Sequence, residues 1–263
     1  MRLTLAITTF ERPDALAAVL ASALSQSGAP DEIIVADDGS GPATCEVIEA
    51  ASRAMPFPVR TVSQEHRGFR LTRLRNLAIA SATTDYIVFV DGDMVLHPEF
   101  VADHRRCARR GFFTQGVRVR LDARATARLI QEPRFQPHAL AAGLGALRRT
   151  YAVHCRALQP LLRRAANPLI AIKGCNQGFW RNDLIRANGF DEQIEGWGPE
   201  DKELCARLMH AGLRRQTLVF GGIAWHLAHS PAVRDRRDVN ERILAETIAN
   251  RRVRCAIGLD SHL

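Results

Sequence analysis

Short apolar runs alternate with longer helical segments through the first ninety residues of the chain. Buried strands are predicted at 3–8, 32–36, 58–62 and 86–90. The segments between them space their apolar residues as helices do, at 11–26, 45–54 and 70–82. Strands that alternate with helices in this way form parallel β-α-β units with right-handed crossovers. The sequence therefore predicts an α/β fold built on a parallel sheet.

Polar clusters follow three of these predicted strands. The letters TTFERP follow the first strand, DDGS follows the second and DGD follows the fourth. Parallel strands end at a common edge, and open sheets of this kind bind ligands beyond that edge. The run YIVFV before DGD is typical of a strand covered on both faces. The carboxylates are therefore expected at the rim of the sheet.

Asp91 and Asp93 are candidate ligands for a cation. Alternate residues at a strand end can reach one ion if the chain turns there, and Gly92 lacks a side chain that would obstruct the turn. Oxygen ligands suit Mg²⁺ or Mn²⁺, ions that also bind diphosphate. The alternative is a solvated turn, because Asp-Gly is a common turn dipeptide. Asp38 has two interpretations as well, a contact to a base or ribose or a local turn.

Two later clusters also carry candidate chemistry. Glu200 and Asp201 follow Trp197 at the expected start of a helix, whose N-terminus favours ionised carboxylates. A carboxylate beside an apolar wall suits a general base, although a purely structural charge at a helix start is the alternative. His226 and His229 have no third nitrogen or sulfur ligand near them in sequence. One of them joining the aspartates in a manganese shell is the more economical interpretation.

Beyond residue 100 the pattern is less regular. Strands are expected at 112–119 and 216–220, a loop before the helix at Glu200, and a terminal amphipathic helix at 238–253. The Arg- and Ala-rich stretch 121–171 predicts short helices and loops. Four arginines precede the DGD strand, namely Arg67, Arg70, Arg73 and Arg75. Some of them could reach a diphosphate, while most are expected to face solvent.

The basic charge is concentrated in one segment. The chain has a net charge of +8, and residues 101–173 hold 15 Lys and Arg against 3 Asp and Glu. Such a segment suits an anionic partner, although a GC-rich genome, which favours Arg and Ala codons, would produce the same excess. No apolar run approaches the ~18 residues of a membrane span. The six cysteines stand singly without a C-x-x-C pair, which favours reduced thiols in a cytoplasmic protein.

Taken in order, these motifs resemble family 2 glycosyltransferases with the GT-A fold. The second half is similar to the galactosyltransferase-type segment of chondroitin polymerases and β-1,4-galactosyltransferases. The match covers about residues 3–229. The motifs that carry it are residues 8–13, 37–40, 68–70, 75–76, 91–93, 189–192 and 197–201, together with His226.

The resemblance implies a mixed, mainly parallel sheet and metal-dependent, inverting transfer of a sugar. The donor would be a nucleotide sugar, expected to be a UDP-sugar, and the acceptor a glycan or lipid-linked glycan of a bacterial surface polysaccharide or lipopolysaccharide. Asp201 would deprotonate the acceptor hydroxyl. Asp93 and His226, with Asp91 beside them, would hold Mn²⁺ or Mg²⁺. The expected substrate-binding residues are Thr8, Phe10, Glu11, Arg12, Asp38, Arg70, Arg75, Asp91, Gly92, Asn176, Trp197 and Glu200.

The chain departs from the family pattern at His66, where an acidic residue is frequent, and at 121–171, which matches nothing in the pattern and is expected to influence acceptor choice. The expected division is a GT-A domain at 1–230 and a helix and tail at 231–263. Within the domain, 1–100 would bind the nucleotide, 101–173 would form a basic insertion facing the acceptor or membrane, and 174–230 would carry catalysis.

Two other functions remain open at this point. A nucleotidyltransferase would need a glycine-rich loop after the first strand, and TTFERPD has no glycine. A non-catalytic anion-binding module is the second alternative. Nucleic acid is not expected as a partner, because 6% aromatic residues provide few stacking platforms. The expected location is cytoplasmic, with peripheral contact to the anionic inner face of the membrane.

Overall fold

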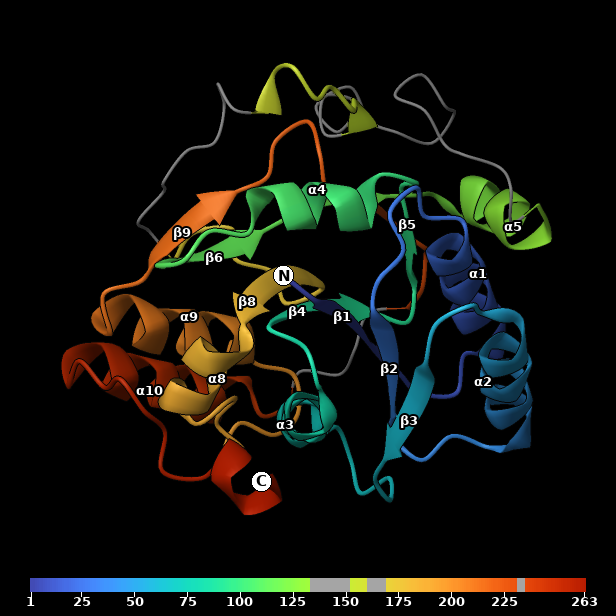
Figure 1. The fold of residues 1–263 in the computed structure, drawn as a ribbon. Helices are drawn as coiled ribbons and strands as arrows, with labels where there is room; N and C mark the ends of the chain where they lie inside the picture. The colour runs from blue at the N-terminus through green and yellow to red at the C-terminus, as the bar shows by residue number, and fades with distance from the viewer. Residues whose placement is uncertain (133–151, 160–168, 231–234) are drawn as a thin grey trace.

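A seven-stranded sheet forms the centre of the protein (Figure 1). The structure is a computed structural model that describes residues 1–132, 152–159, 169–230 and 235–263. In spatial order, the strands are β3 (Val59–Ser63), β2 (Glu32–Asp37), β1 (Leu3–Thr9), β4 (Tyr86–Asp91), β8 (Asn176–Trp180), β6 (Phe112–Gln115) and β9 (Arg214–Thr217). Only the pairs made by β8 are antiparallel. The predicted mainly parallel α/β sheet is confirmed.

A second, three-stranded sheet lies against the first. Its order is β5 (Met94–Leu96), β10 (Ile223–His226) and β7 (Val117–Arg120). Strand β10 pairs antiparallel with β5 and parallel with β7. This small sheet therefore places His226 beside the chain that has just left β4.

Helices cover both faces of the large sheet (Figure 1). One face packs against the small sheet and against α1 (Pro13–Leu24), α2 (Pro42–Ala54), α4 (Phe100–Cys107) and α5 (Ala123–Gln131). The other face packs against α3 (Leu71–Ser81), α8 (Arg181–Ala187), α9 (Glu200–His210) and the 3-10 turn η2 (Leu259–His262). The last helix, α10 (Arg237–Ala249), packs on α9.

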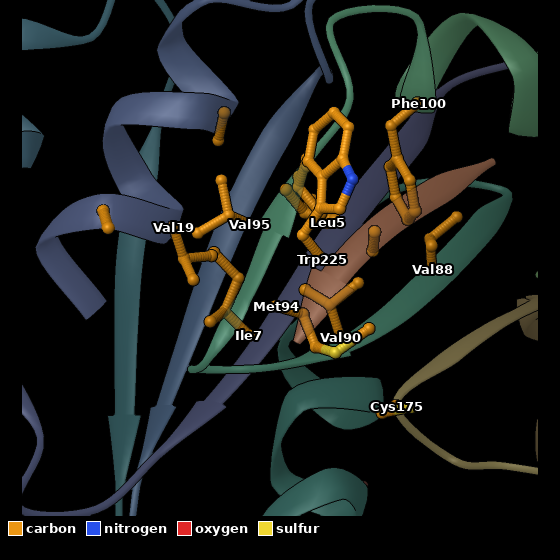
Figure 2. Close-up of a cluster of buried hydrophobic side chains, with 14 of the residues drawn as sticks. Leu5, Ile7, Val19, Val88, Val90, Met94, Val95, Phe100, Cys175 and Trp225 are labelled. Atoms are coloured by element: carbon orange, nitrogen blue, oxygen red, sulfur yellow. The ribbon is translucent and has the colours of Figure 1, made fainter. Parts of the chain in front are cut away.

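The central strands are continuously apolar because successive side chains are buried on opposite faces of the sheet. Leu5 and Val88 point into the cluster drawn in Figure 2, where Trp225 of β10 lies over them. Ile87 and Phe89 belong to the cluster on the opposite face. Both faces are thus covered, as the YIVFV run predicts.

The prediction of one strand at 112–119 is wrong, because this segment forms β6 and β7 in different sheets. The chain crosses from one sheet to the other at Gly116, whose N–H donates to the carbonyl of Asn176 at 2.9 Å. The Asn176 side chain donates to Val117 O at 2.9 Å. This amide holds the crossing point, and part of the expected basic insertion supplies core strands.

Other boundaries in the second half also differ from the prediction. The strand expected at 216–220 ends at Thr217, and Phe220 has a φ of +58° that no strand accommodates. The terminal helix ends at Ala249 rather than 253. The loop expected before the helix at Glu200 is present at 188–199, whereas β8 and α8, which precede it, were not predicted.

The predicted short helices at 121–171 are represented by α5, while 133–151 and 160–168 lie outside the described residues. In the part of the chain that the structure describes, no helix has the length and apolarity that crossing a membrane requires.

Candidate active site

Asp93, His226 and His229 form a three-residue cluster beyond the end of β4. The Nε2 atom of His229 lies 3.2 Å from Asp93 Oδ2, and that of His226 lies 3.7 Å from the same oxygen. The two imidazole nitrogens are 3.3 Å apart. One carboxylate oxygen and two nitrogens at this spacing can hold a single metal ion.

The electrostatics of the cluster fit a metal site. Asp93 Oδ1 is buried and has no hydrogen-bond partner in the structure. Burial and the neighbouring Asp91 raise the pKa of Asp93 to about 6. Burial, with Arg118 and His229 nearby, lowers the pKa of His226 to about 3, so the imidazole is neutral as a ligand must be. An unsatisfied carboxylate oxygen beside neutral imidazole is an arrangement that a divalent cation would complete.

The local backbone explains why these side chains meet. The Gly92 N–H donates to the carbonyl of Thr8 at 2.6 Å, and a Cβ on Gly92 would lie 2.8 Å from that oxygen. Only glycine allows this tight turn after β4. Beyond the turn, Met94 pairs with His226, and Leu227 N–H donates to Asp93 O at 3.0 Å. The pairing of β5 with β10 therefore sets Asp93 beside the histidines.

Asp91 faces Arg75. The guanidinium of Arg75 lies 3.2 Å from Asp91 Oδ1 and 3.2 Å from Glu200 Oε1, and its side chain is only 2% exposed. Thr8 Oγ1 also donates to Asp91 Oδ1, at 3.3 Å. Arg75, expected to contact substrate, instead joins two carboxylates that are 109 positions apart in the sequence.

Glu200 and Asp201 begin helix α9, as the sequence predicts. Asp201 Oδ2 accepts the Gly174 N–H at 2.7 Å, and its Oδ1 accepts the Lys202 N–H at 2.7 Å. Burial raises the pKa of Asp201, and burial together with the adjacent Asp201 raises that of Glu200. A carboxylate with a raised pKa is a competent proton acceptor near neutral pH.

Asp38 lies at the opposite end of the rim, after β2. Its two oxygens accept from Gln64 Nε2 at 2.5 Å and contact His66 Nδ1 at 2.9 Å. The His66 ring stacks on Phe10 with centroids 4.1 Å apart and planes at 9°. The structure thus brings together Phe10 and Asp38, which are expected to contact the nucleotide, and His66, which departs from the family pattern.

Glu11, Arg12 and Arg70 also lie at this rim. Glu11, at a φ of +47°, accepts the Gly41 N–H at 2.8 Å and so ties the turn after β1 to the turn after β2. Arg12 NH1 lies 3.8 Å from Asp93 Oδ2. Arg70 donates to the carbonyl of Glu65. Of these three expected substrate contacts, Arg12 lies beside the metal cluster, whereas Glu11 and Arg70 support the backbone of the rim.

Asn176 and Trp197 differ in what they can reach. Asn176 is 1% exposed, and its amide hydrogen-bonds to Val117 O, Gly222 O and His104. Its expected contact with substrate is not possible in this structure, since a side chain bonded on all sides in the interior cannot reach a ligand. Trp197 is partly exposed in the loop before α9.

Sequence reasoning gave His229 less weight than His226 and did not find Gly174. The i, i+3 spacing of the histidines was the available signal for His229. Nothing in the sequence around Gly174 signals its hydrogen bond to Asp201, because that contact spans 27 positions.

Two models of known protein families match this chain. The family model described as glycosyl transferase family 2 matches residues 4–162. A second model, described as the N-terminal domain of galactosyltransferase, matches residues 164–230. The residues after 230 lie outside both matches.

Among curated proteins, a chondroitin synthase of Escherichia coli is 28% identical over 238 residues, which cover 85% of this chain and 34% of that protein. A hyaluronan synthase of Pasteurella multocida is 27% identical, covering 85% and 24%. A validoxylamine A glucosyltransferase of Streptomyces hygroscopicus subsp. limoneus is 26% identical, covering 80% and 48%. The chain thus spans between about a quarter and a half of these relatives.

Among solved structures, S. aureus TarS 1–349 in complex with UDP-GlcNAc has a TM-score of 0.65 at 14% identity, covering 100% of this chain and 69% of that one. Mannosyltransferase PcManGT of Pyrobaculum calidifontis, in complex with GDP-Man and Mn²⁺, has a TM-score of 0.61 at 17% identity, covering 87% and 57%. At these identities the likeness concerns the fold.

The sheet order and these neighbours show the GT-A fold. The family 2 model covers more than half of the chain, and the chain therefore belongs to glycosyltransferase family 2. The resemblance inferred from the motifs is confirmed.

Proposed function

We propose that this glycosyltransferase moves a sugar from a UDP-sugar to a glycan acceptor of a bacterial surface polysaccharide, with a divalent metal and with inversion at the anomeric carbon. The observation that carries the proposal is the unsatisfied Asp93 carboxylate beside His226 and His229. The relatives named as a chondroitin synthase and a hyaluronan synthase, and the neighbour solved with UDP-GlcNAc, support it.

Each part of the rim has a role in this reaction. Asp38 and Phe10 would bind the base once the His66 ring, which stacks on Phe10, has moved aside. Asp93 and the two histidines would hold Mn²⁺ or Mg²⁺, which neutralises charge on a leaving diphosphate. Arg12, 3.8 Å from Asp93, adds a cation at the same point. These residues bind and orient the donor.

Asp201 acts on the acceptor. Hydrogen bonds from Gly174 and Lys202 fix its carboxylate, and its raised pKa suits removal of a proton from a sugar hydroxyl. The resulting oxygen nucleophile displaces the nucleoside diphosphate in one step, which inverts the anomeric configuration. Glu200, paired with Arg75, lies next to it to bind acceptor hydroxyls.

The proposed donor is tested by thermal shift with UDP-, GDP- and CDP-sugars, each with and without Mn²⁺. We expect stabilisation by a UDP-sugar that depends on the metal, because diphosphate and metal bind together. Asp93→Ala should abolish this stabilisation. Stabilisation by GDP-mannose and by no UDP compound would overturn the donor assignment and leave the family intact.

The basic segment 101–173 supports a further part of the proposal, namely peripheral contact with anionic lipid at the cytoplasmic face of the membrane, where a phosphorylated or lipid-linked acceptor would be reached. Co-sedimentation with vesicles of phosphatidylglycerol and phosphatidylcholine should exceed that with phosphatidylcholine alone, and should fall with salt. Equal binding to both vesicles would remove the membrane from the proposal.

A further inference from the structure

The loop before α9, residues 191–199, carries Trp197 and leads directly into Glu200 and Asp201. We call it the acceptor loop, a name that rests on the function proposed above. It contains two glycines, and Gly196 has a φ of +74°. A loop of this composition needs external contacts to keep one conformation.

Helix α10 supplies the first of these contacts. The side-chain amide of Asn240 donates to the carbonyl of Glu195 at 2.8 Å and to that of Trp197 at 3.1 Å. Asn240 is 0% exposed, so neither donation competes with water. The fit leaves no spare room, since a Cβ on Gly198 would lie 2.6 Å from Asn240 Nδ2.

The donor side supplies contacts to the same loop. Gly196 N–H donates to the carbonyl of Phe69 at 2.7 Å. Thr72 of α3 donates to the carbonyl of Ile194 at 3.1 Å. The acceptor loop is thus fixed between α3 and α10, and α10 lies outside both family matches.

We propose that Asn240 is a positioning residue that sets where Trp197 and Asp201 meet the acceptor sugar. It touches no reacting atom itself. Its two donations satisfy loop carbonyls on both sides of Gly196, three and five positions before Glu200. Without them these carbonyls are buried and unpaired, and the loop relaxes toward water. Among the described residues, both hydrogen bonds of the Asn240 side chain go to the acceptor loop and none goes to Thr8, Asp38 or Asp91.

Thr247 on the same helix provides a matched control. It is also 0% exposed, and its hydroxyl donates to Glu203 Oε1 at 2.9 Å, within α9 and away from the loop. Thr247→Val therefore removes one buried hydrogen bond of α10 without touching residues 191–199. A general weakening of the packing between α10 and α9 would appear in both variants.

The first measurement is amide hydrogen exchange of the whole protein. Asn240→Ala should speed exchange at 191–199 by at least about tenfold, because it removes two buried hydrogen bonds. Thr247→Val should leave that segment unchanged. Gly198→Ala, which wedges the same contact from the loop side, should reproduce the result if Asn240→Ala does not fold. Unchanged exchange at 191–199 in both Asn240→Ala and Gly198→Ala would overturn the inference.

The second measurement compares the kinetics of the acceptor with those of the donor. The donor is UDP-GlcNAc with Mn²⁺. Its hydrolysis uses water as the acceptor, and its transfer uses a chondroitin or hyaluronan oligosaccharide. Asn240→Ala should raise the oligosaccharide KM about tenfold while donor KM and donor hydrolysis change less than about twofold. An equal rise in donor KM, or the same change in Thr247→Val, would show a merely structural role and overturn the inference. A wild-type protein with neither hydrolysis nor transfer with any UDP-sugar of the thermal-shift series would overturn the proposed function itself.

Discussion

The donor side and the acceptor side of the site are built in different ways. On the donor side, Thr8 and Asp91 pair at the ends of the adjacent parallel strands β1 and β4, and Asp38 directly follows β2. On the acceptor side, Asp201 is fixed by the loop at Gly174, and the loop before it by α3 and α10. The donor side thus follows from strand order, whereas the acceptor side requires the folded protein as a whole.

Arg75 connects the two sides. It is a buried cation between Asp91 on β4 and Glu200 on α9, at 3.2 Å from each. A buried charge is tolerated only with partners. We therefore expect substitutions on the donor side to change donor binding and those on the acceptor side to change acceptor use. Substitutions at Arg75 are the exception, because it contacts both sides.

The largest effect is expected from the pair Asp201→Asn and Asp93→Ala. Asp201→Asn should lower kcat by about 10²–10⁴-fold, the usual contribution of a general base, while donor binding is retained. Asp93→Ala should also abolish transfer, because the metal cluster is lost, and it should abolish the metal-dependent thermal shift. Transfer assays and thermal shifts on both variants give the comparison.

Asp238→Asn, at the exposed start of α10, is the control for both. It should retain activity and thermal shift. Full transfer activity in Asp201→Asn would remove the acceptor side from the scheme, and a full thermal shift in Asp93→Ala would remove the metal cluster from the donor side.

A smaller effect is expected within the metal cluster. His226→Ala and His229→Ala should each weaken Mn²⁺ binding by about tenfold or more, since even indirect changes at metal sites have effects of this size. Electron paramagnetic resonance measures the concentration of free Mn²⁺ and so gives the affinity of each variant for the ion. Unchanged affinity in His229→Ala would return the site to Asp93 and His226, the pair that the sequence favoured.

The pH dependence of stability tests the acceptor side separately. Burial and Asp201 raise the pKa of Glu200 from 4.5 to about 8. Between these values the folded protein keeps a proton that the unfolded chain has lost. Glu200 therefore lowers the free energy of unfolding as pH rises through this window, by at most about 1.4 kcal/mol per pH unit.

Glu200→Gln removes this contribution. The free energy of unfolding of the variant, minus that of the wild type, should rise from pH 5 to pH 8 and then level off. Urea denaturation of both proteins across this range measures the difference. A difference that stays constant with pH would mean that Glu200 is ionised in the folded protein, and that Arg75 dominates its environment.

The sequence predicted the donor side of the fold better than the acceptor side. Strands β1 to β4 and the carboxylates after them were predicted from periodicity, because each β-α-β unit is a local pattern. Strand β8 was not predicted. Its sequence, NQGFW, is fully buried but mixes polar residues and a glycine, since Asn176 and Gln177 make interior hydrogen bonds that no local pattern signals.

The site shows the same limit. The sequence motifs predicted Asp93, His226 and Asp201 as candidate site residues. They did not predict the role of Arg75, because an arginine among four in one segment gives no sign that it alone is buried between two carboxylates. Asn240 lies on a predicted amphipathic helix, and its contacts with residues 195 and 197 depend on how that helix packs.

The smallest effect is expected at His66, on the donor side. Its ring covers one face of Phe10 and contacts one oxygen of Asp38. Both are groups that a nucleotide base would use, so the base must displace this ring. Stacking of an aromatic pair contributes about 0.5–1.5 kcal/mol, and His66→Ala should therefore lower the donor KM a few-fold. Steady-state kinetics at fixed acceptor concentration measure it.

His66→Phe sharpens this result, because it keeps the stacked ring and removes the contact with Asp38. If His66 competes with the base mainly through Phe10, the Phe variant should keep the wild-type donor KM or raise it. A raised donor KM in His66→Ala would reverse the interpretation: the histidine would then be part of the platform on which the base stacks. In that case the donor side, too, would depend on a residue that strand order alone does not place.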